Sequence, residues 1–333
     1  RRHLRFRGTG NMYKLKLDPD NTNIPFLKFR MLAFVLSGLL ILGSAIMFFS
    51  VGLNKGIDFE GGILIEIGTE TPPDLGDMRS SLGGLDLGQI ALQTFGSETD
   101  ILIRVQRQEG DASAQEEAVN VIKQQLASDY GDSISYRRVE FVGPTVSEEL
   151  VIAATEAVIV AVLAMLVYIW LRFEWHYSVG AVVALVHDVV LTIGMFSVTG
   201  IEFNLASVAA ILTIVGYSIN DTVVVYDRIR ENFRRYKKLT VEDLINLSIN
   251  ETLTRTTMTS LTTLLALVAL YIFGGEVIRG FATAMIFGVV VGTYSSIFVA
   301  APVLLHIGLT HQKEEEDGFQ GAERTDDNAE EKS

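Results

Sequence analysis

The chain has 333 residues, of which 49% are hydrophobic, a positive mean hydropathy and a formal net charge of −13. This composition is too apolar for an ordinary soluble protein of this length. Because the chain has no cysteine, disulfides, thiolate metal sites and a cysteine nucleophile are excluded. The motif GxxxxGK[ST] is also absent, so the sequence offers no ATP-binding P-loop.

Six stretches are long and apolar enough for a helix that crosses a bilayer, which takes roughly 20 residues. Their apolar residues occur all round the helix, which is typical of contact with lipid. The six predicted spans are Met31–Leu53, Leu150–Leu171, Tyr177–Thr199, Phe203–Tyr226, Thr256–Phe273 and Gly280–Leu309. The first lies too far from the N-terminus for a cleaved signal peptide, so we expect an uncleaved anchor.

Lysine and arginine gather before the first span and after the fourth, two segments that share a side if the spans alternate. The positive-inside rule places both segments, and both termini, in the cytoplasm. Residues 54–148 are then extracytoplasmic, in the periplasm of a cell that has one. The remaining predicted parts are a cytoplasmic segment 1–30, the first span 31–53, a five-span bundle 149–309 and a disordered acidic tail 310–333. The tail is solubilising or docks on a basic partner.

Residues 54–148 are polar and rich in turn residues, unlike the spans. Strands are predicted at Ile63–Ile67, Gln89–Phe95, Ile101–Gln106 and Ser133–Phe141, and helices at Asp74–Leu85 and Gln115–Tyr130. The turn residues Gly96, Ser97 and Asp100 join the middle strands. The residues expected to face the core of this domain are Leu75, Met78, Leu82, Val119, Ile122 and Leu126. The order β-α-β-β-α-β predicts an α+β, ferredoxin-like domain inserted between the first two spans.

A glycine-rich motif, GIDFEGG, follows the first span and contains Gly56, Asp58, Gly61 and Gly62. Glycine permits backbone rotation. The motif is therefore either a coupling joint between the membrane part and the inserted domain or only a tight turn. The inserted domain contains no phosphate loop, metal-ligand cluster or nucleophile, which favours a contact module.

Ionisable residues at membrane depth are costly and mark pathways. Asp221 lies in the fourth predicted span, with Thr213 and Tyr217 on the same helix face and Ser218 and Asn220 close by. Arg255 begins the fifth span and is followed by Thr259. Since these antiparallel spans bring both charges to similar depth, the pair forms either a proton-controlled switch or a permanent ion pair.

His187 and Asp188 lie in the middle of the third predicted span. They form either a proton relay or a neutral histidine that satisfies a buried carboxyl group. In the sixth span, small residues recur every four positions and permit close approach of another helix. This helix-packing face consists of Gly288, Gly292, Ser296 and Ala300. Thr240 begins a capping-box-like sequence, and the segment after it is expected to form a separate short helix on the cytoplasmic surface.

Several motifs in order resemble the SecF subunits of the SecD/SecF family, which is similar to the RND exporters. They are GIDFEGG, VEFVGPTV (Val139–Val146), LRFEWHYSVGAVVALVHDV (Leu171–Val189), GYSINDTVVVYDRIRENFR (Gly216–Arg234), LTRTTMTSLTTLL (Leu253–Leu265) and FGGEVIRGF (Phe273–Phe281). The resemblance extends from about residue 25 to 310.

The resemblance implies a subunit of the bacterial inner membrane that is not an enzyme. It implies that proton flow drives motion of the periplasmic domain and helps a preprotein leave the SecYEG channel. Asp221 matches the family's proton-pathway aspartate, and Arg255 the arginine of its fifth span. The implied partners are SecD, SecYEG, YajC, the preprotein and the lipid bilayer, with no nucleic acid. No cofactor or metal is implied, with protons as the coupling ion.

Two other functions compete with this one. An RND-type small-molecule exporter fits the spans, but six spans are half of such a transporter and the inserted domain is small for a drug pocket. An intramembrane aspartyl protease would use Asp188 and Asp221. It requires a GxGD motif, and no such motif occurs in the chain.

Overall fold

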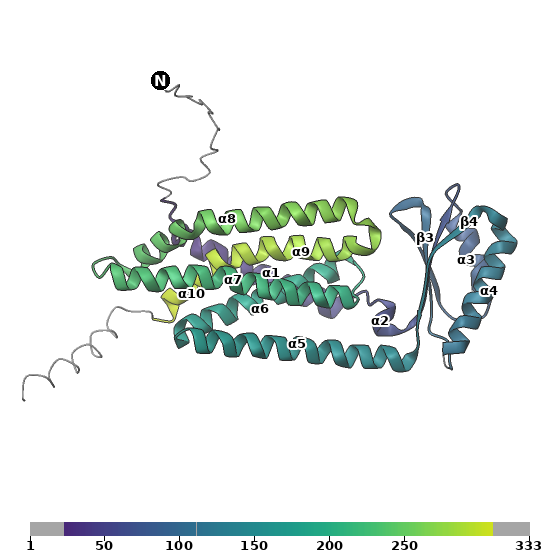
Figure 1. Cartoon of the computed structure of the whole chain (residues 1–333), viewed down its shortest axis with the longest axis horizontal. Helices are drawn as coiled ribbons and strands as arrows, with labels where there is room; N and C mark the ends of the chain where they lie inside the picture. The colour runs from purple at the N-terminus through teal and green to yellow at the C-terminus, as the bar shows by residue number, and fades with distance from the viewer. Residues whose placement is uncertain (1–22, 111, 309–333) are drawn as a thin grey trace, which may run out of the picture.

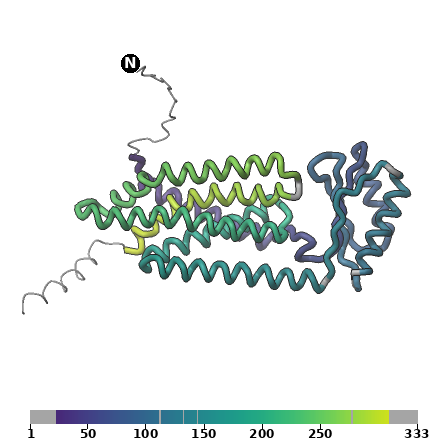
Figure 2. The backbone as a smooth tube through the Cα atoms, viewed as in Figure 1, coloured from purple at the N-terminus to yellow at the C-terminus, as the bar shows by residue number. Residues whose placement is uncertain are grey.

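The structure is a computed structural model that describes residues 23–110 and 112–308. Long helices form a bundle, and a small sheet domain stands at one end of it (Figure 1). The described chain enters and leaves the bundle at the opposite end (Figure 2). The acidic tail and most of the N-terminal segment lie outside the described residues, so the predictions made for them stay predictions.

Six helices of the described chain are long and apolar enough to cross a membrane. They are α1 (Arg30–Ser50), α5 (Pro144–Arg172), α6 (Trp175–Thr199), α7 (Leu205–Arg235), α8 (Val241–Phe273) and α9 (Gly275–Ser295). A short 3-10 turn (Phe26–Phe29) precedes α1. Helix α9 continues through a π turn (Ser296–Ala300) into α10 (Ala301–His306). Each predicted span overlaps one of these helices.

The separate surface helix predicted after Thr240 is wrong, because α8 runs unbroken from Val241 to Phe273. No glycine or proline occurs within it, so nothing interrupts the hydrogen-bond ladder. Its first turns also bury Leu244 and Ile245 against the bundle. The predicted cap is confirmed, since the Thr240 hydroxyl accepts a hydrogen bond from the amide of Asp243 at 3.1 Å.

The helices divide into an inner and an outer group. Helices α6, α7 and α9 bury more than half of their most apolar stretch, whereas α1, α5 and α8 leave most of theirs exposed. Exposed apolar side chains such as Leu163 on α5 and Leu265 on α8 therefore face outward. Outer helices of this kind are typical of a protein whose solvent is lipid.

The sheet domain contains four antiparallel strands in the order β2-β3-β1-β4. The elements are β1 (Gly62–Thr69), α3 (Leu75–Gly83), β2 (Ile90–Phe95), β3 (Ser97–Val105), α4 (Ala112–Tyr130) and β4 (Ile134–Val142). The element order is the predicted one. Strand β3 begins four residues earlier than Ile101, because the turn uses Gly96 alone, at φ +87°.

The two faces of the sheet differ. Alternate residues of β1, among them Ile63 and Ile65, are fully buried beneath α3 and α4, as are the predicted core residues Met78, Ile122 and Leu126. The opposite face carries Leu64 and Leu102 and turns toward the bundle. A cleft of about 480 Å³ separates this face from the ends of α6, α7 and α9.

Candidate functional site

Asp188 lies in the middle of α6, and its side chain is completely buried. Three side chains contact the carboxylate. Nδ1 of His187 lies 2.8 Å from Oδ1, while Oδ2 accepts hydrogen bonds from Ser218 on α7 and from Ser295 on α9, the latter at 2.7 Å. The carboxylate therefore joins α6, α7 and α9 at one depth.

Asp221 lies on α7 and is 5% exposed. Its Oδ2 accepts a hydrogen bond of 2.9 Å from the hydroxyl of Ser296, the first residue of the π turn. Ser295 and Ser296 thus hold one buried carboxylate each. Consecutive residues of a helix point about 100° apart, which lets two neighbouring serines reach two different helices.

Ser218 was predicted only as a neighbour of Asp221, Ser295 was not predicted, and Ser296 was predicted only for helix packing. The sequence signal that could have identified Ser295 and Ser296 is the run Thr293–Ser296 (TYSS) inside an otherwise apolar span. A hydroxyl at membrane depth tends to bond across helices. The structure adds that Ser296 begins a π turn, a widened helical turn that frequently occurs at functional sites.

Arg255 is exposed on α8, and no ion pair joins it to Asp221 among the residues that the structure describes. The next residue, Thr256, is the buried one, so Arg255 points away from the bundle interior. The permanent ion pair that the sequence left open is therefore absent from this arrangement.

The residues predicted to form a polar seam around Asp221 do not all face inward. The Tyr217 hydroxyl donates to Ser260 of α8 at 3.4 Å. Thr213, Asn220 and Thr259 are exposed, and both threonines donate to carbonyl groups of their own helices. Of the four residues, Tyr217 is the one that connects two helices.

The glycine face of α9 contacts α7 of the same chain. A Cβ atom on Gly288 would collide with the side chain of Ile214, and one on Gly292 would lie 3.1 Å from Cβ of Ser218. Ser218 is the residue that donates to Asp188. Close packing at Gly292 therefore brings this hydroxyl toward the carboxylate.

His187 has a second ring nitrogen, Nε2, that is buried and has no hydrogen-bond partner in the described part of the chain. Its ring lies 6.0 Å from that of Tyr294, whose hydroxyl donates to the carbonyl of Ala33 on α1 at 3.0 Å. One imidazole nitrogen thus contacts Asp188, and the other has no hydrogen-bond partner among the described residues.

The GIDFEGG motif forms the short helix α2 (Ile57–Glu60) rather than a tight turn. Gly61 and Gly62 follow at φ +72° and +117°, values that favour glycine. A Cβ atom on Gly62 would lie 2.6 Å from the carbonyl oxygen of Val105. Asp58 accepts a hydrogen bond of 2.9 Å from the amide of Leu205 and so holds the start of α7.

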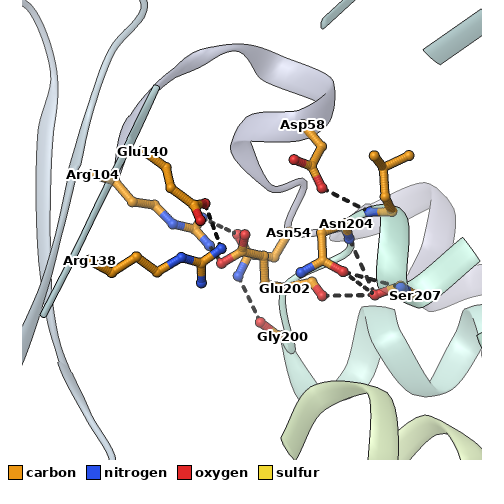
Figure 3. Close-up of polar contacts among 10 residues, drawn as sticks. Asn54, Asp58, Arg104, Arg138, Glu140, Gly200, Glu202, Asn204 and Ser207 are labelled. Carbon is orange, nitrogen blue, oxygen red and sulfur yellow. Dashed lines mark hydrogen bonds and ion pairs between the residues drawn. The ribbon is translucent and has the colours of Figure 1, made fainter. Parts of the chain in front are cut away.

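This motif docks on the loop between α6 and α7 (Figure 3). Lys55 and Phe203 form a parallel β-bridge, in which Gly56 N donates to the Phe203 carbonyl at 2.9 Å. Asn54 donates to the carbonyl of Gly200 at 2.8 Å. Arg104 of β3 forms an ion pair with Glu202 in the same loop. We call this contact between residues 54–58 and 200–205, with Arg104, the joint.

A second ion pair lies beside the joint on β4, where Arg138 donates to Glu140 at 2.5 Å. The hydrogen bond to Glu140 is the main reason that the pKa of Arg138 rises above its ordinary value. The group is therefore a fixed positive charge at the edge of the cleft. Among the described residues, no cluster of three or more His, Asp or Glu side chains could hold a metal ion.

The sequence matches two family models. Residues 122–310 match the family described as "Protein export membrane protein SecD/SecF, C-terminal", and residues 46–73 match the "SecD/SecF GG Motif". The chain belongs to the SecD/SecF family. The second match contains the whole GIDFEGG segment, so the joint coincides with a motif that the family shares.

Curated relatives and solved structures agree with this assignment. The chain is 48% identical over 295 residues to "Protein translocase subunit SecF" of Rickettsia felis, covering 88% of this chain and 94% of the relative. It is 47% identical to the protein of the same name from Rickettsia bellii, covering 88% and 96%.

The crystal structure of the translocon-associated membrane protein SecDF from a Thermus species superposes with a TM-score of 0.77 at 35% identity. That match covers 87% of this chain and 39% of the SecDF chain. A super-membrane-facing form of SecDF gives a TM-score of 0.64 at 34% identity, covering 91% of this chain and 40% of the SecDF chain. This SecD/SecF family member is thus similar to less than half of each SecDF chain.

Proposed function

We propose that this chain is the SecF subunit of a bacterial Sec protein-export machinery and couples proton movement to a late stage of preprotein translocation. The observation that carries the proposal is a pair of buried carboxylates, Asp188 and Asp221, which accept hydrogen bonds from two consecutive serines, the last residue of α9 and the first residue of the π turn. Buried ionisable groups at membrane depth mark ion pathways. Family membership supplies the preprotein as cargo, and protons are the coupling ion without a cofactor or enzymatic step.

The proposed switch consists of Asp221 and Arg255. An ionised Asp221 attracts the arginine across the α7–α8 contact, whereas a protonated Asp221 needs only a hydroxyl partner such as Ser296. The arrangement with Arg255 exposed corresponds to the second state. One unit charge that crosses 100 mV yields about 2.3 kcal/mol. Since about 1.4 kcal/mol changes an equilibrium tenfold, one proton is enough to favour one state of the bundle.

The joint gives this switch a route to the sheet domain. Asp188 and Asp221 lie on α6 and α7, and the loop between these helices contacts the sheet domain. A change in the relative position of the two helices would therefore alter the contact between Arg104 and Glu202.

The remaining parts of the proposal follow from the family. The sheet domain, with strand order β2-β3-β1-β4 and helices on one face, would be a ferredoxin-like domain in the periplasm. The chain would lie in the inner membrane with both termini in the cytoplasm. SecD would supply the other half of the twelve-span assembly, beside SecYEG and YajC.

The test is pulse-chase export of a signal-bearing preprotein in cells that depend on this chain. Asp221→Asn should cause precursor to accumulate, while the variant still inserts and co-purifies with SecD. The matched control is Asn220→Ala, at an exposed neighbouring position, which should export normally.

Normal export by Asp221→Asn would overturn the role of this carboxylate. Normal export by cells that lack the chain altogether, accompanied by a new sensitivity to small toxic compounds, would instead favour an RND-type exporter.

A further inference from the structure

The bundle has a second polar feature at the end far from the sheet domain, where α5 and α7 enclose a shallow surface cavity of about 490 Å³. Four arginines and two carboxylates line it. These residues are Arg172, Asp227, Arg230, Glu231, Arg234 and Arg235. We call this cavity the arginine cavity.

Both carboxylates of the arginine cavity already have partners. Asp227 accepts hydrogen bonds of 2.6 and 2.8 Å from Arg172. Glu231 forms an ion pair of 2.6 Å with Arg228, which lies outside the cavity. The cavity therefore keeps an excess of positive charge on its remaining arginines.

Arg230, Arg234 and Arg235 carry this excess charge, and Arg235 is already stacked on the ring of Tyr236. Arg230 has its nearest carboxylate, Glu174, at 3.8 Å, and its Nε atom is buried without a hydrogen-bond partner in the described part of the chain. Arg234 is exposed, and none of the ion pairs found among the described residues includes it. Arg230 and Arg234 are four apart on α7 and share one face of the helix.

The surroundings place the arginine cavity at the surface of a membrane. The chain has two tryptophans, and they lie on either side of Arg172: Trp170 is 76% exposed and Trp175 54%. Tryptophan concentrates where the hydrocarbon core meets the head groups. Tyr168, one turn before Arg172, and Leu171 are also exposed, so an apolar surface begins directly beside the cavity.

We propose that the arginine cavity binds the head group of an anionic phospholipid. The guanidinium groups of Arg230 and Arg234 would donate to the phosphodiester, since arginine matches the geometry of phosphate oxygens. The acyl chains would lie along Tyr168 and Leu171. A zwitterionic lipid brings its own cation, which the arginines repel. Basic pockets between membrane spans bind anionic head groups in this way.

The experiment measures lipid binding to the purified full-length chain in detergent by native mass spectrometry. Dioleoyl phosphatidylglycerol and dioleoyl phosphatidylcholine are titrated separately. We expect tighter binding of phosphatidylglycerol, and a loss of about fivefold in its affinity for each arginine removed in Arg230→Gln/Arg234→Gln. The matched control, Arg79→Gln/Arg107→Gln, removes two exposed arginines of the sheet domain and should bind as the wild type does.

Three results would overturn the proposal. The first is equal affinity for the two lipids, or an unchanged affinity in the Arg230→Gln/Arg234→Gln variant. The second is displacement of the lipid by inorganic phosphate or glycerol phosphate at equal concentration, which would assign the cavity to a free phosphate. The third is a gain of phosphatidylglycerol affinity in a chain shortened to residue 313, which would make the acidic tail the occupant.

Discussion

The interior of the sheet domain and the interior of the helix bundle contain different kinds of side chain. Between the sheet and helices α3 and α4, the core consists of aliphatic side chains and Met78, and the buried Gln115 exchanges hydrogen bonds with the backbone of Gln108. The bundle instead buries Asp188, Asp221 and several hydroxyl groups. Water drives apolar side chains into the first core. Lipid provides no such force, so small residues and hydrogen bonds specify the second.

The largest expected effect is the loss of an aliphatic side chain from the sheet domain. Ile65 is completely buried in β1, and Ile65→Ala should lower the free energy of unfolding of this domain by about 2–5 kcal/mol. The measurement is limited proteolysis of the purified chain within residues 54–148 as temperature rises. Ile152→Ala makes the same change at an exposed position of α5 and should shift this midpoint little. Equal shifts of the midpoint for both variants would show that burial of Ile65 in the core of the sheet domain is not the cause of its effect.

In the bundle, a comparable loss of stability should follow the replacement of a buried polar residue. Asp188→Ala removes the acceptor of two hydroxyl groups, Ser218 and Ser295. Each buried donor left without a partner costs about 1–3 kcal/mol. Unfolding of the chain in mixed micelles, followed by helical circular dichroism, should show the loss. Asp188→Asn, which keeps an acceptor oxygen, should recover part of the stability, and no recovery would argue against the hydrogen bonds as the cause.

A comparable or smaller effect is expected from the glycine face of α9. Gly288→Ala places a methyl group against Ile214, and overpacking of this kind costs about 1–3 kcal/mol. The same micelle assay should show that a second change, Ile214→Ala, restores part of the loss by making room. Gly43→Ala, where nothing lies within 4 Å of the added atom, serves as the control. Destabilisation by Gly43→Ala equal to that by Gly288→Ala would show that glycine matters here for reasons other than helix contact.

The smallest effect should occur where the two regions meet. The Arg104–Glu202 pair is partly exposed, with side chains 20% and 24% accessible, and such pairs contribute about 0.2–1 kcal/mol. Arg104→Glu should loosen the joint with little change in overall stability, and the exchanged pair Arg104→Glu/Glu202→Arg should tighten it again. Hydrogen exchange of the amides of residues 54–58 measures this. Identical exchange rates in the wild type and both variants would show that the ion pair does not stabilise the joint.

Sequence patterns predicted the sheet domain better than the bundle interior. The alternation in β1 and the spacing of Val119, Ile122 and Leu126 predict which residues are buried, because apolar side chains avoid water and polar ones remain in contact with it. No comparable sorting operates in lipid. The direction in which Thr213 or Arg255 points was therefore not readable from spacing alone, and the predicted contact between Arg255 and Asp221 depended on helix rotation.

The two serines at the junction of α9 and the π turn illustrate the same limit. Ser295 and Ser296 occur in an apolar span, and nothing in their spacing tells which helix each one faces. A π turn shifts the helix faces by a fraction of a turn, and the sequence gives no periodic signal for that shift. By contrast, the glycine-rich pattern of GIDFEGG was visible in the sequence and indicated unusual backbone angles. The structure has positive φ angles at Gly61 and Gly62, which residues other than glycine rarely adopt.

The joint also has a mechanical consequence. The sheet domain is tethered covalently at two places, the segment after α1 and Gly143 before α5. The joint, which includes the Arg104–Glu202 ion pair, adds a third attachment. Three attachments fix the orientation of a rigid body, whereas two leave it free to swing about the line that joins them. Opening the joint, that is, the bridge together with the contacts of Asn54, Asp58 and Arg104, would therefore convert a clamped domain into a hinged one, with no need to bend any strand or helix.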